Sequence, residues 1–162
     1  MSKGFWIFLV AGLAVVGALV FTMLTATQGA HLRLEGKILK VRILALPSSG
    51  ASIVIVDFRA NNPSNVPFVV NAVTLHLVPA TGDAVDGQIV SKADIENVFR
   101  YEKLLGPKYN SVLSLQDRIP PLQTLDLMAG ARFELPEAAV NARKAIRIQL
   151  EDVGGATAEL SE

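Results

Sequence analysis

The chain has 162 residues, with 15 basic and 15 acidic side chains, no cysteine and two histidines, enough for one domain of ordinary size. The balanced charge argues against a nucleic-acid-binding domain, which needs a basic excess. The lack of cysteine excludes disulfides, thiolate metal sites and a cysteine nucleophile, and two histidines far apart in the sequence argue against a histidine-rich metal site.

The first element is an uncharged apolar run from Gly4 to Leu24. In helical form a run of this length rises about 30 Å, which matches the hydrocarbon core of a bilayer. We therefore predict that residues 1–24 form a short tail and a transmembrane helix. A cleaved signal peptide is the alternative, but its apolar region is typically about 7–15 residues long, which favours a retained anchor.

Small side chains recur along this predicted helix at spacings of three and four residues, which places them on one side. They are Ala11, Ala14, Ala18, Thr22 and Thr25. Such a stripe lets a second helix approach closely, so we predict that it packs against another membrane protein. The alternative is that the stripe only reflects the usual abundance of small residues in membrane helices.

The charges that flank the apolar run help to predict which side of the membrane the domain occupies. Lys3 precedes the run, whereas Arg33, Lys37, Lys40 and Arg42 follow it. A short charged tail before a long apolar run favours a cytoplasmic N-terminus and a periplasmic domain. The basic cluster after the run argues for the opposite orientation.

After a small, polar linker at residues 25–30, the pattern becomes β-rich over residues 31–162. Short apolar or alternating runs separated by turn residues predict a β-sandwich. The predicted strands cover residues 31–46 (one strand, or two around Gly36), 52–60, 68–79, 88–90, 122–128, 131–135, 145–150 and 156–160. Within residues 68–79, strict alternation would place Val69, Asn71, Val73, Leu75 and Leu77 on one face.

A helical and loop-like insertion, residues 91–121, interrupts the β pattern. Ser91 and Asp94 have the spacing of a capping box, and apolar residues follow at helical spacing. The insertion also holds residue types that are favoured at protein interfaces: Phe99, Arg100, Tyr101, Tyr109 and Arg118. We predict a partner interface here; the alternative is that Ile95, Val98 and Phe99 simply cover one open end of the sandwich.

A turn between two predicted strands carries a family resemblance. Its residues are Asn62, Pro63, Ser64 and Asn65, followed by Pro67 and Phe68 at the start of the next strand and by Gly82 after it. The segment Val56–Gly82 resembles the group-2 late embryogenesis abundant proteins, or WHy domain, although Ser64 departs from that family's Asn-Pro-Asn form. The resemblance implies an immunoglobulin-like β-sandwich, often tethered to a membrane, in which Asn62, Pro63 and Asn65 form the turn and no residue is catalytic.

No motif predicts an active site. The nucleophile elbow, phosphate loops, zinc-protease helix and EF-hand spacing are absent from the sequence. His31 follows the apolar run and His76 lies in mid-strand, so neither stands beside a recognisable nucleophile. We therefore name no catalytic residue, cofactor or metal ligand, and predict that the protein is not an enzyme.

These observations predict a structural role. The leading hypothesis is a single-span accessory subunit that docks a β-sandwich onto a larger membrane assembly, with the lipid bilayer and other membrane-protein subunits as partners. A bacterial photosynthetic reaction centre or an electron-transfer complex would suit such a subunit. The alternative is a free membrane-tethered module of the late-embryogenesis type that protects against stress or binds a ligand or lipid. An open apolar cavity between the sheets would favour the ligand-binding alternative.

Overall fold

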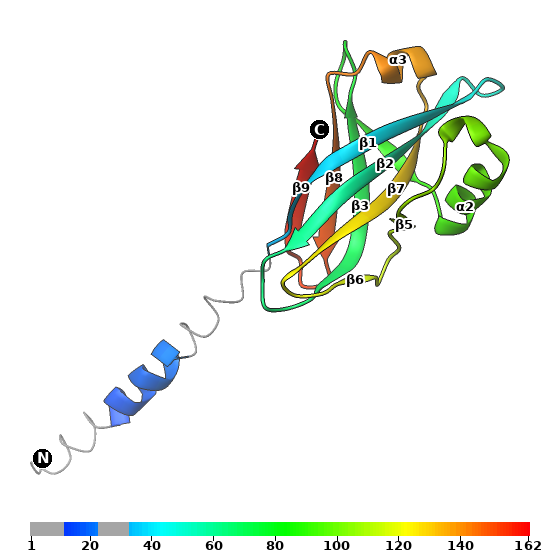
Figure 1. Cartoon of the computed structure of the whole chain (residues 1–162). Coiled ribbons are helices and arrows are strands. Elements are labelled where there is room, and N and C mark those ends of the chain that lie inside the picture. Colours follow the sequence, from blue (N-terminus) through cyan, green and yellow to red (C-terminus); the bar gives the residue numbers. More distant parts are fainter. Residues whose placement is uncertain (1–11, 23–32) are drawn as a thin grey trace, which may run out of the picture. The chain divides into compact units, whose positions relative to one another are not determined.

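The computed structural model describes residues 12–22 and 33–162, which are coloured in Figure 1. Residues 12–22 form a helix, and the β-structure belongs to a separate compact unit, Leu32–Glu162. Among the described residues, no helix is both long and apolar enough to cross a membrane. The predicted span, Gly4–Leu24, extends past the described helix at both ends, so a membrane-crossing role for it stays a prediction.

The small-residue stripe falls only partly within the described helix. Ala14, Ala18 and Thr22 are exposed there, as are all residues of this helix that the structure describes. Ala11 and the predicted linker at residues 25–30 lie outside the described residues. The packing role of the stripe therefore also stays a prediction.

In the described part of the chain, the strands pair in the order β1-β2-β7-β4-β3-β8-β9. Two short strands lie off this path, with β5 running parallel to β7 and β6 pairing with β3. The bounds are β1 Glu35–Leu46, β2 Ala51–Asn62, β3 Phe68–Val78, β4 Val85–Ile89, β5 Ser111–Val112, β6 Arg118–Ile119, β7 Gln123–Phe133, β8 Ala145–Asp152 and β9 Thr157–Ser161.

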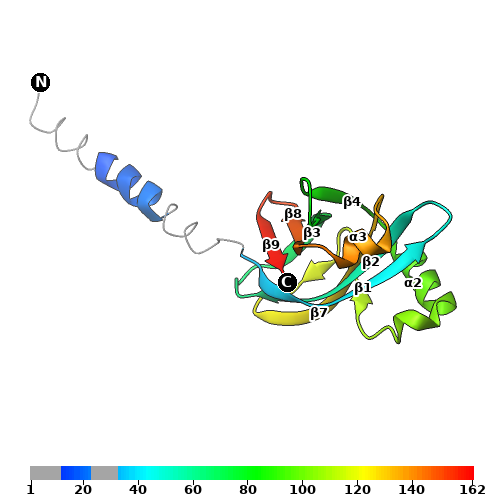
Figure 2. The same ribbon diagram turned by 90° about the horizontal axis from the view of Figure 1, so that it is seen from above.

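The strands form two facing layers, as the view from above in Figure 2 shows. One layer holds β1, β2 and β7, and the other holds β3, β8 and β9. Strand β4 joins them, because Val85–Gly87 pair with β3 while Gln88 and Ile89 pair with β7. Since β1 also contacts β9, the sandwich is barrel-like. The predicted mainly-β sandwich is confirmed.

The main core fills the space between the layers. Phe58 of β2, Phe68 of β3 and Phe133 of β7 are fully buried in it. The short helix α3, Glu137–Asn141, places Val140 in the same core and lies across one end of the sandwich (Figure 2).

A second, smaller core lies on the outer face of the layer formed by β1, β2 and β7. There Ile55 of β2 and Met128 of β7 pack against helix α2, Lys92–Tyr101, and against Leu105 of the following 3-10 turn η1, Lys103–Leu105. Figure 1 shows α2 beside this layer. The helix therefore covers a sheet face and not an open end of the sandwich.

The predicted break between residues 122–128 and 131–135 is wrong, because β7 runs through both segments. Gly130 lies in mid-strand beneath the helix, where an added Cβ would come 2.9 Å from Ile95 Cδ1. A glycine inside a strand often marks such a close approach. The glycine permits tight helix packing and does not end the strand.

The predicted alternation in β3 holds only from Val73 onward. The pairing register with β8 shifts between Val70 and Ala72, so that Val70 is buried in the same core as Leu75 and Leu77. An extra residue in one strand, a β-bulge, changes the face that each preceding side chain occupies.

Candidate functional site

A buried ion pair fastens the insertion to the sheet. Arg42 Nη2 of β1 lies 2.9 Å from Asp57 Oδ2 of β2, and only 4% of each side chain is exposed. Arg42 Nη1 donates to the Pro107 carbonyl (3.1 Å), and Asn110 Nδ2 donates to Asp57 Oδ1 (2.8 Å). The Arg42 guanidinium carbon also lies 5.0 Å from the centre of the Phe99 ring. One charge pair on the sheet thus contacts helix α2 and the loop that follows η1.

Sequence reasoning missed this anchor. Its signal is one charged residue within an apolar stretch of each strand, Arg42 in VRILAL and Asp57 in SIVIVDF. A buried charge needs a partner, because leaving water costs it several kcal/mol. The two strands are antiparallel neighbours, which brings these side chains together on the outer face.

The predicted interface residues separate into two groups. Phe99 is half-buried and packs on the second core beneath Arg42, so it supports the insertion from inside. Arg100, Tyr101 and Tyr109 are exposed, as an interface requires. Arg118 is exposed as well, but it lies on β6, which pairs with β3.

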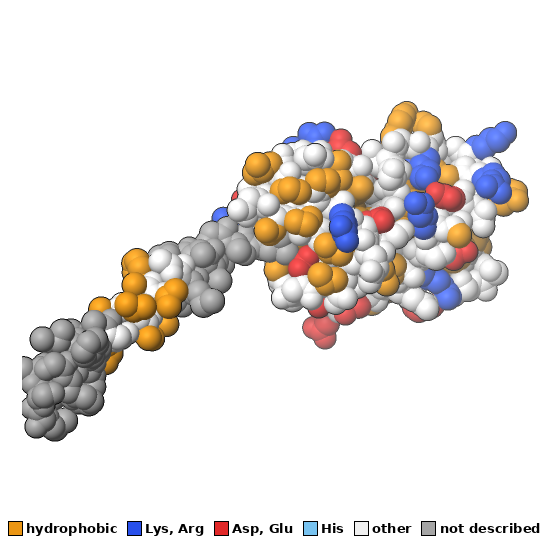
Figure 3. All heavy atoms as spheres, turned by 90° about the horizontal axis from the view of Figure 1, so that it is seen from below, with side chains coloured by type: hydrophobic (Ala, Val, Ile, Leu, Met, Phe, Trp, Pro, Cys, Tyr) orange, Lys and Arg blue, Asp and Glu red, His pale blue; other side chains and the backbone are white. Residues whose placement is uncertain are grey.

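A further exposed residue, Leu104, was not predicted. In the turn η1 its neighbour Leu105 points into the second core, which leaves Leu104 98% exposed. Tyr101 and Tyr109 are 75% and 76% exposed. We use the term insertion surface for five exposed residues of α2, η1 and the loop after it: Arg100, Tyr101, Lys103, Leu104 and Tyr109. It combines aromatic and apolar side chains with basic ones. On the face of the domain seen in Figure 3, hydrophobic side chains lie among Lys and Arg side chains and also among Asp and Glu side chains.

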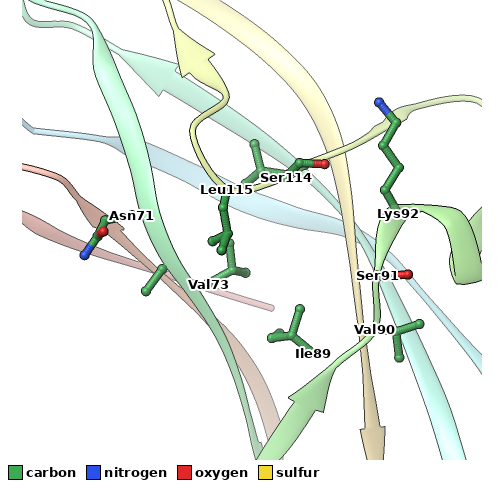
Figure 4. Close-up of a pocket in the computed structure, with 10 residues that line it drawn as sticks. Asn71, Val73, Ile89, Val90, Ser91, Lys92, Ser114 and Leu115 are labelled. Atoms are coloured by element: carbon green, nitrogen blue, oxygen red, sulfur yellow. The ribbon is translucent and has the colours of Figure 1, made fainter.

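The domain also has an open apolar pocket, with a volume of about 640 Å³. It lies between β3, the end of β4, the start of α2 and the connection between β5 and β6 (Figure 4). Its apolar lining comprises Ala72, Val73, Ile89, Val90, Leu113 and Leu115, and its polar lining comprises Asn71, Ser91, Lys92 and Ser114.

The pocket exists because β4 changes partner. After pairing with Leu75–Leu77 of β3, β4 crosses to β7, while β6 pairs with β3 only at Phe68 and Val69. Residues 71–74 of β3 therefore have no strand partner on the edge that faces β4 and β6, within the part of the chain that the structure describes. The pocket opens at this interruption between the two layers.

The family turn motif forms a buried hydrogen-bond network. Asn62 Nδ2 donates to the carbonyls of Val66 (2.8 Å) and Ile119 (3.1 Å), and Asn62 Oδ1 accepts from the amide and hydroxyl of Ser64 (3.1 and 2.5 Å). Pro63 and Asn65 are exposed. Asn62 thus fixes the connection between β2 and β3 and holds it against β6.

Across residues 12–22 and 33–162, no group of three or more His, Asp or Glu side chains is placed to hold a metal ion. His76 of β3 is half-buried, and its Nδ1 lies 2.5 Å from Oδ1 of Asp86 on the adjoining strand β4. This is a cross-strand pair within the sheet.

Comparison with known proteins identifies no family. No family model and no curated protein matches the chain. One similar solved structure is an uncharacterized β-sandwich protein from Clostridium difficile, with 12% identity, a TM-score of 0.42, and coverage of 80% of this chain and 85% of that one. Another is a structural-genomics target with 10% identity, a TM-score of 0.39 and coverage of 80% of both chains. The class that the fold defines is a β-sandwich protein, and the resemblance to the WHy domain stays a prediction.

Proposed function

We propose that this protein is a non-enzymatic accessory subunit that a single N-terminal span anchors in a membrane and that docks onto a larger complex through the insertion surface. The observation that carries the proposal is the exposure of Tyr101, Leu104 and Tyr109 on a segment that a buried ion pair fastens to the sheet. Aromatic side chains on a rigid support lose little conformational freedom on binding, which favours association.

The basic side chains beside these residues indicate the chemistry of the partner. Arg100 and Lys103 are exposed and form no ion pair among the described residues, whereas Lys108 is paired with Glu96 (3.2 Å). A partner surface with an apolar centre and an acidic rim would complement this arrangement. We expect that partner to be another membrane-protein subunit on the periplasmic side.

The uncharged run Gly4–Leu24 supports the anchor, and its small residues would give a second contact within the bilayer. A bacterial photosynthetic or electron-transfer complex is the setting that we propose for such a subunit. In this proposal the sandwich is immunoglobulin-like and related to the WHy domain, on the strength of the Asn62-Pro63 turn.

The test is the size at which the protein migrates after native membranes are solubilised in mild detergent. Comigration with a large complex at fixed stoichiometry is expected, and mass spectrometry of that complex would identify the partner. The combined variant Tyr101→Ala, Leu104→Ser and Tyr109→Ala should dissociate. Val153→Ser, which changes an exposed apolar residue in the turn between β8 and β9, should remain bound. Migration of the unmodified protein at monomer size would overturn the proposal.

The second candidate function is that of a free, membrane-tethered ligand-binding module of the late-embryogenesis type. The apolar pocket favours it, because its volume lies within the roughly 300–1,000 Å³ that is usual for small-molecule sites. Such a module would bind an apolar fluorescent probe without any partner, and Leu115→Asp would abolish that binding. If the module only protects against stress, its protective activity should be unchanged by Leu115→Asp and by the substitutions on the insertion surface.

A further inference from the structure

The walls of the apolar pocket are held in place by the rest of the fold. The Val90 amide donates to the Gly130 carbonyl (2.9 Å), and the Leu113 amide donates to the Met128 carbonyl (2.8 Å), so both flanking segments are tied to β7. A pocket with fixed walls loses little entropy on binding, which raises its affinity for a ligand of matching shape.

The polar groups of the pocket are separated from its apolar floor. Figure 4 shows Leu115 and Val73 near one another and Ile89 below them, while the Ser114 hydroxyl points toward the side of the pocket from which Lys92 extends outward. This arrangement matches an amphiphile, whose apolar chain would cover the three aliphatic side chains while its polar head remains at the rim.

Lys92 sets the sign of the charge that this head would carry. It is the charged residue of the pocket lining, it is exposed, and it forms no ion pair among the described residues. It also lies in the first turn of α2, where the helix dipole favours a negative group. An anionic head at the rim would therefore meet a cation that forms no ion pair within the described part of the chain.

Nearby carboxylates limit how much negative charge the rim can accept. Asp94 accepts a hydrogen bond from the Ser91 hydroxyl (2.7 Å), Asp117 accepts one from the Ser114 amide (2.8 Å), and Glu151 accepts one from the Asn71 side chain (3.1 Å). These groups would repel a dianion such as a phosphate monoester more than a singly charged head. The geometry thus favours one negative charge over two.

We propose that this pocket binds a single-chain carboxylic acid of the fatty-acid class, with its carboxylate at Lys92 and Ser114 and its chain over Val73, Ile89 and Leu115. The inference rests on the second candidate function, ligand binding, and adds the chemical class of the ligand. A membrane-anchored domain would have a ready supply of such acids in the surrounding bilayer.

The test is photo-labelling of the full chain reconstituted in phosphatidylcholine nanodiscs. The probe is a diazirine-bearing palmitic acid, compared with the matching diazirine-bearing alcohol, and labelled peptides are mapped by mass spectrometry. We expect the acid to label the segments that contain Val73, Ile89 or Leu115. Lys92→Ala should lower labelling by the acid about three- to fivefold, as for the loss of one partly exposed ion pair, without lowering labelling by the alcohol.

Two variants separate the possible outcomes. Lys144→Ala removes the same charge from an exposed residue outside the pocket and should leave labelling unchanged. Leu115→Asp should abolish pocket labelling by both probes, and its fold is checked by circular dichroism. Equal labelling by acid and alcohol with no effect of Lys92→Ala would overturn the carboxylate assignment while leaving ligand binding intact. Absence of labelling in the pocket by either probe would overturn ligand binding itself.

Discussion

The Arg42 guanidinium lies 2.9 Å from the Asp57 carboxylate, with both side chains almost completely shielded from water. Each charge is compensated mainly by the other, and both make hydrogen bonds to the loop after η1. The pair therefore couples two strands of the sheet to the segment that carries the insertion surface. Loss of one partner would affect both the stability of the domain and the position of that surface.

We expect Asp57→Ala to lower the free energy of unfolding by about 3–5 kcal/mol, because it leaves the Arg42 charge buried and unpaired. The double variant Arg42→Met, Asp57→Leu should lose much less, since it removes both charges and keeps apolar volume. Urea unfolding of the full chain in detergent, followed by circular dichroism, measures both. A loss below about 1 kcal/mol for Asp57→Ala would contradict the interpretation that the two charges are shielded from water and compensated mainly by each other.

The asparagines of the predicted turn motif should differ in their effect on stability. Asn62→Ala removes both donors and the acceptor of a buried side chain, so the Ile119 carbonyl loses the Asn62 amide and the Val66 carbonyl keeps only the Ser64 hydroxyl as a side-chain donor. We expect a loss of about 1–3 kcal/mol in the free energy of unfolding. Asn65→Ala changes an exposed residue of the same turn and should remain within about 0.5 kcal/mol of the original chain. Similar losses at the two positions, measured by urea unfolding, would contradict this assignment.

The Arg59–Asp126 pair predicts a pH dependence. The hydrogen bond from Arg59 holds the pKa of Asp126 below its ordinary value of 3.8. Because this pKa is lower in the folded chain than in the unfolded chain, the contribution of the pair to stability is complete above about pH 3.8 and is lost as the pH falls through the folded-state pKa. The stability difference between the original chain and Asp126→Asn should therefore be present at neutral pH and vanish in acid.

Two measurements test this prediction. The Asp126 carboxyl should titrate below its ordinary range by NMR, and the same titration in Arg59→Met should return toward it. A stability difference that persisted unchanged below the titration of Asp126 would show that its charge is not the cause. Both side chains are well exposed, so high salt should weaken the effect.

Periodicity predicted most strands to within a few residues, because burial against a core repeats every second residue. It failed where the backbone departs from regular pairing. The bulge at Asn71 has no signature in the sequence, and Gly130 resembles a turn residue although it lies under helix α2. Capping was better predicted, since the interaction is local: the Ser91 hydroxyl accepts a hydrogen bond from the Asp94 amide (3.2 Å).

The candidate site was predicted only in part, for a related reason. Residue type indicated an interface in the insertion, but which side chains point outward depends on contacts distant in sequence. Arg42 reaches Pro107, which is 65 residues away, and Asn110 reaches Asp57, which is 53 residues away. The apolar pocket likewise depends on β4 leaving β3 to pair with β7, a change of partner that no local pattern reports.

Phe99 and Tyr101 lie in one helix and were predicted to share an interface role, yet the structure gives them different surroundings. Phe99→Ala should lower the free energy of unfolding by roughly 1–3 kcal/mol, because it leaves a gap beneath Arg42 in the second core and removes a cation–π contact. Tyr101→Ala should remain within about 0.5 kcal/mol, since the side chain is 75% exposed, but should weaken association with the partner complex.

Measuring unfolding and comigration on the same pair of variants separates a supporting residue from a contacting one. Phe99→Leu serves as the control, because it retains apolar volume beneath Arg42 and should recover part of the lost stability. If Tyr101→Ala destabilised the chain as much as Phe99→Ala, the tyrosine would be a packing residue. If neither variant altered comigration, the insertion surface would not be the contact with the partner complex. The association would then tolerate both the loss of the exposed Tyr101 ring and the loss of the Phe99 ring that supports the insertion from inside.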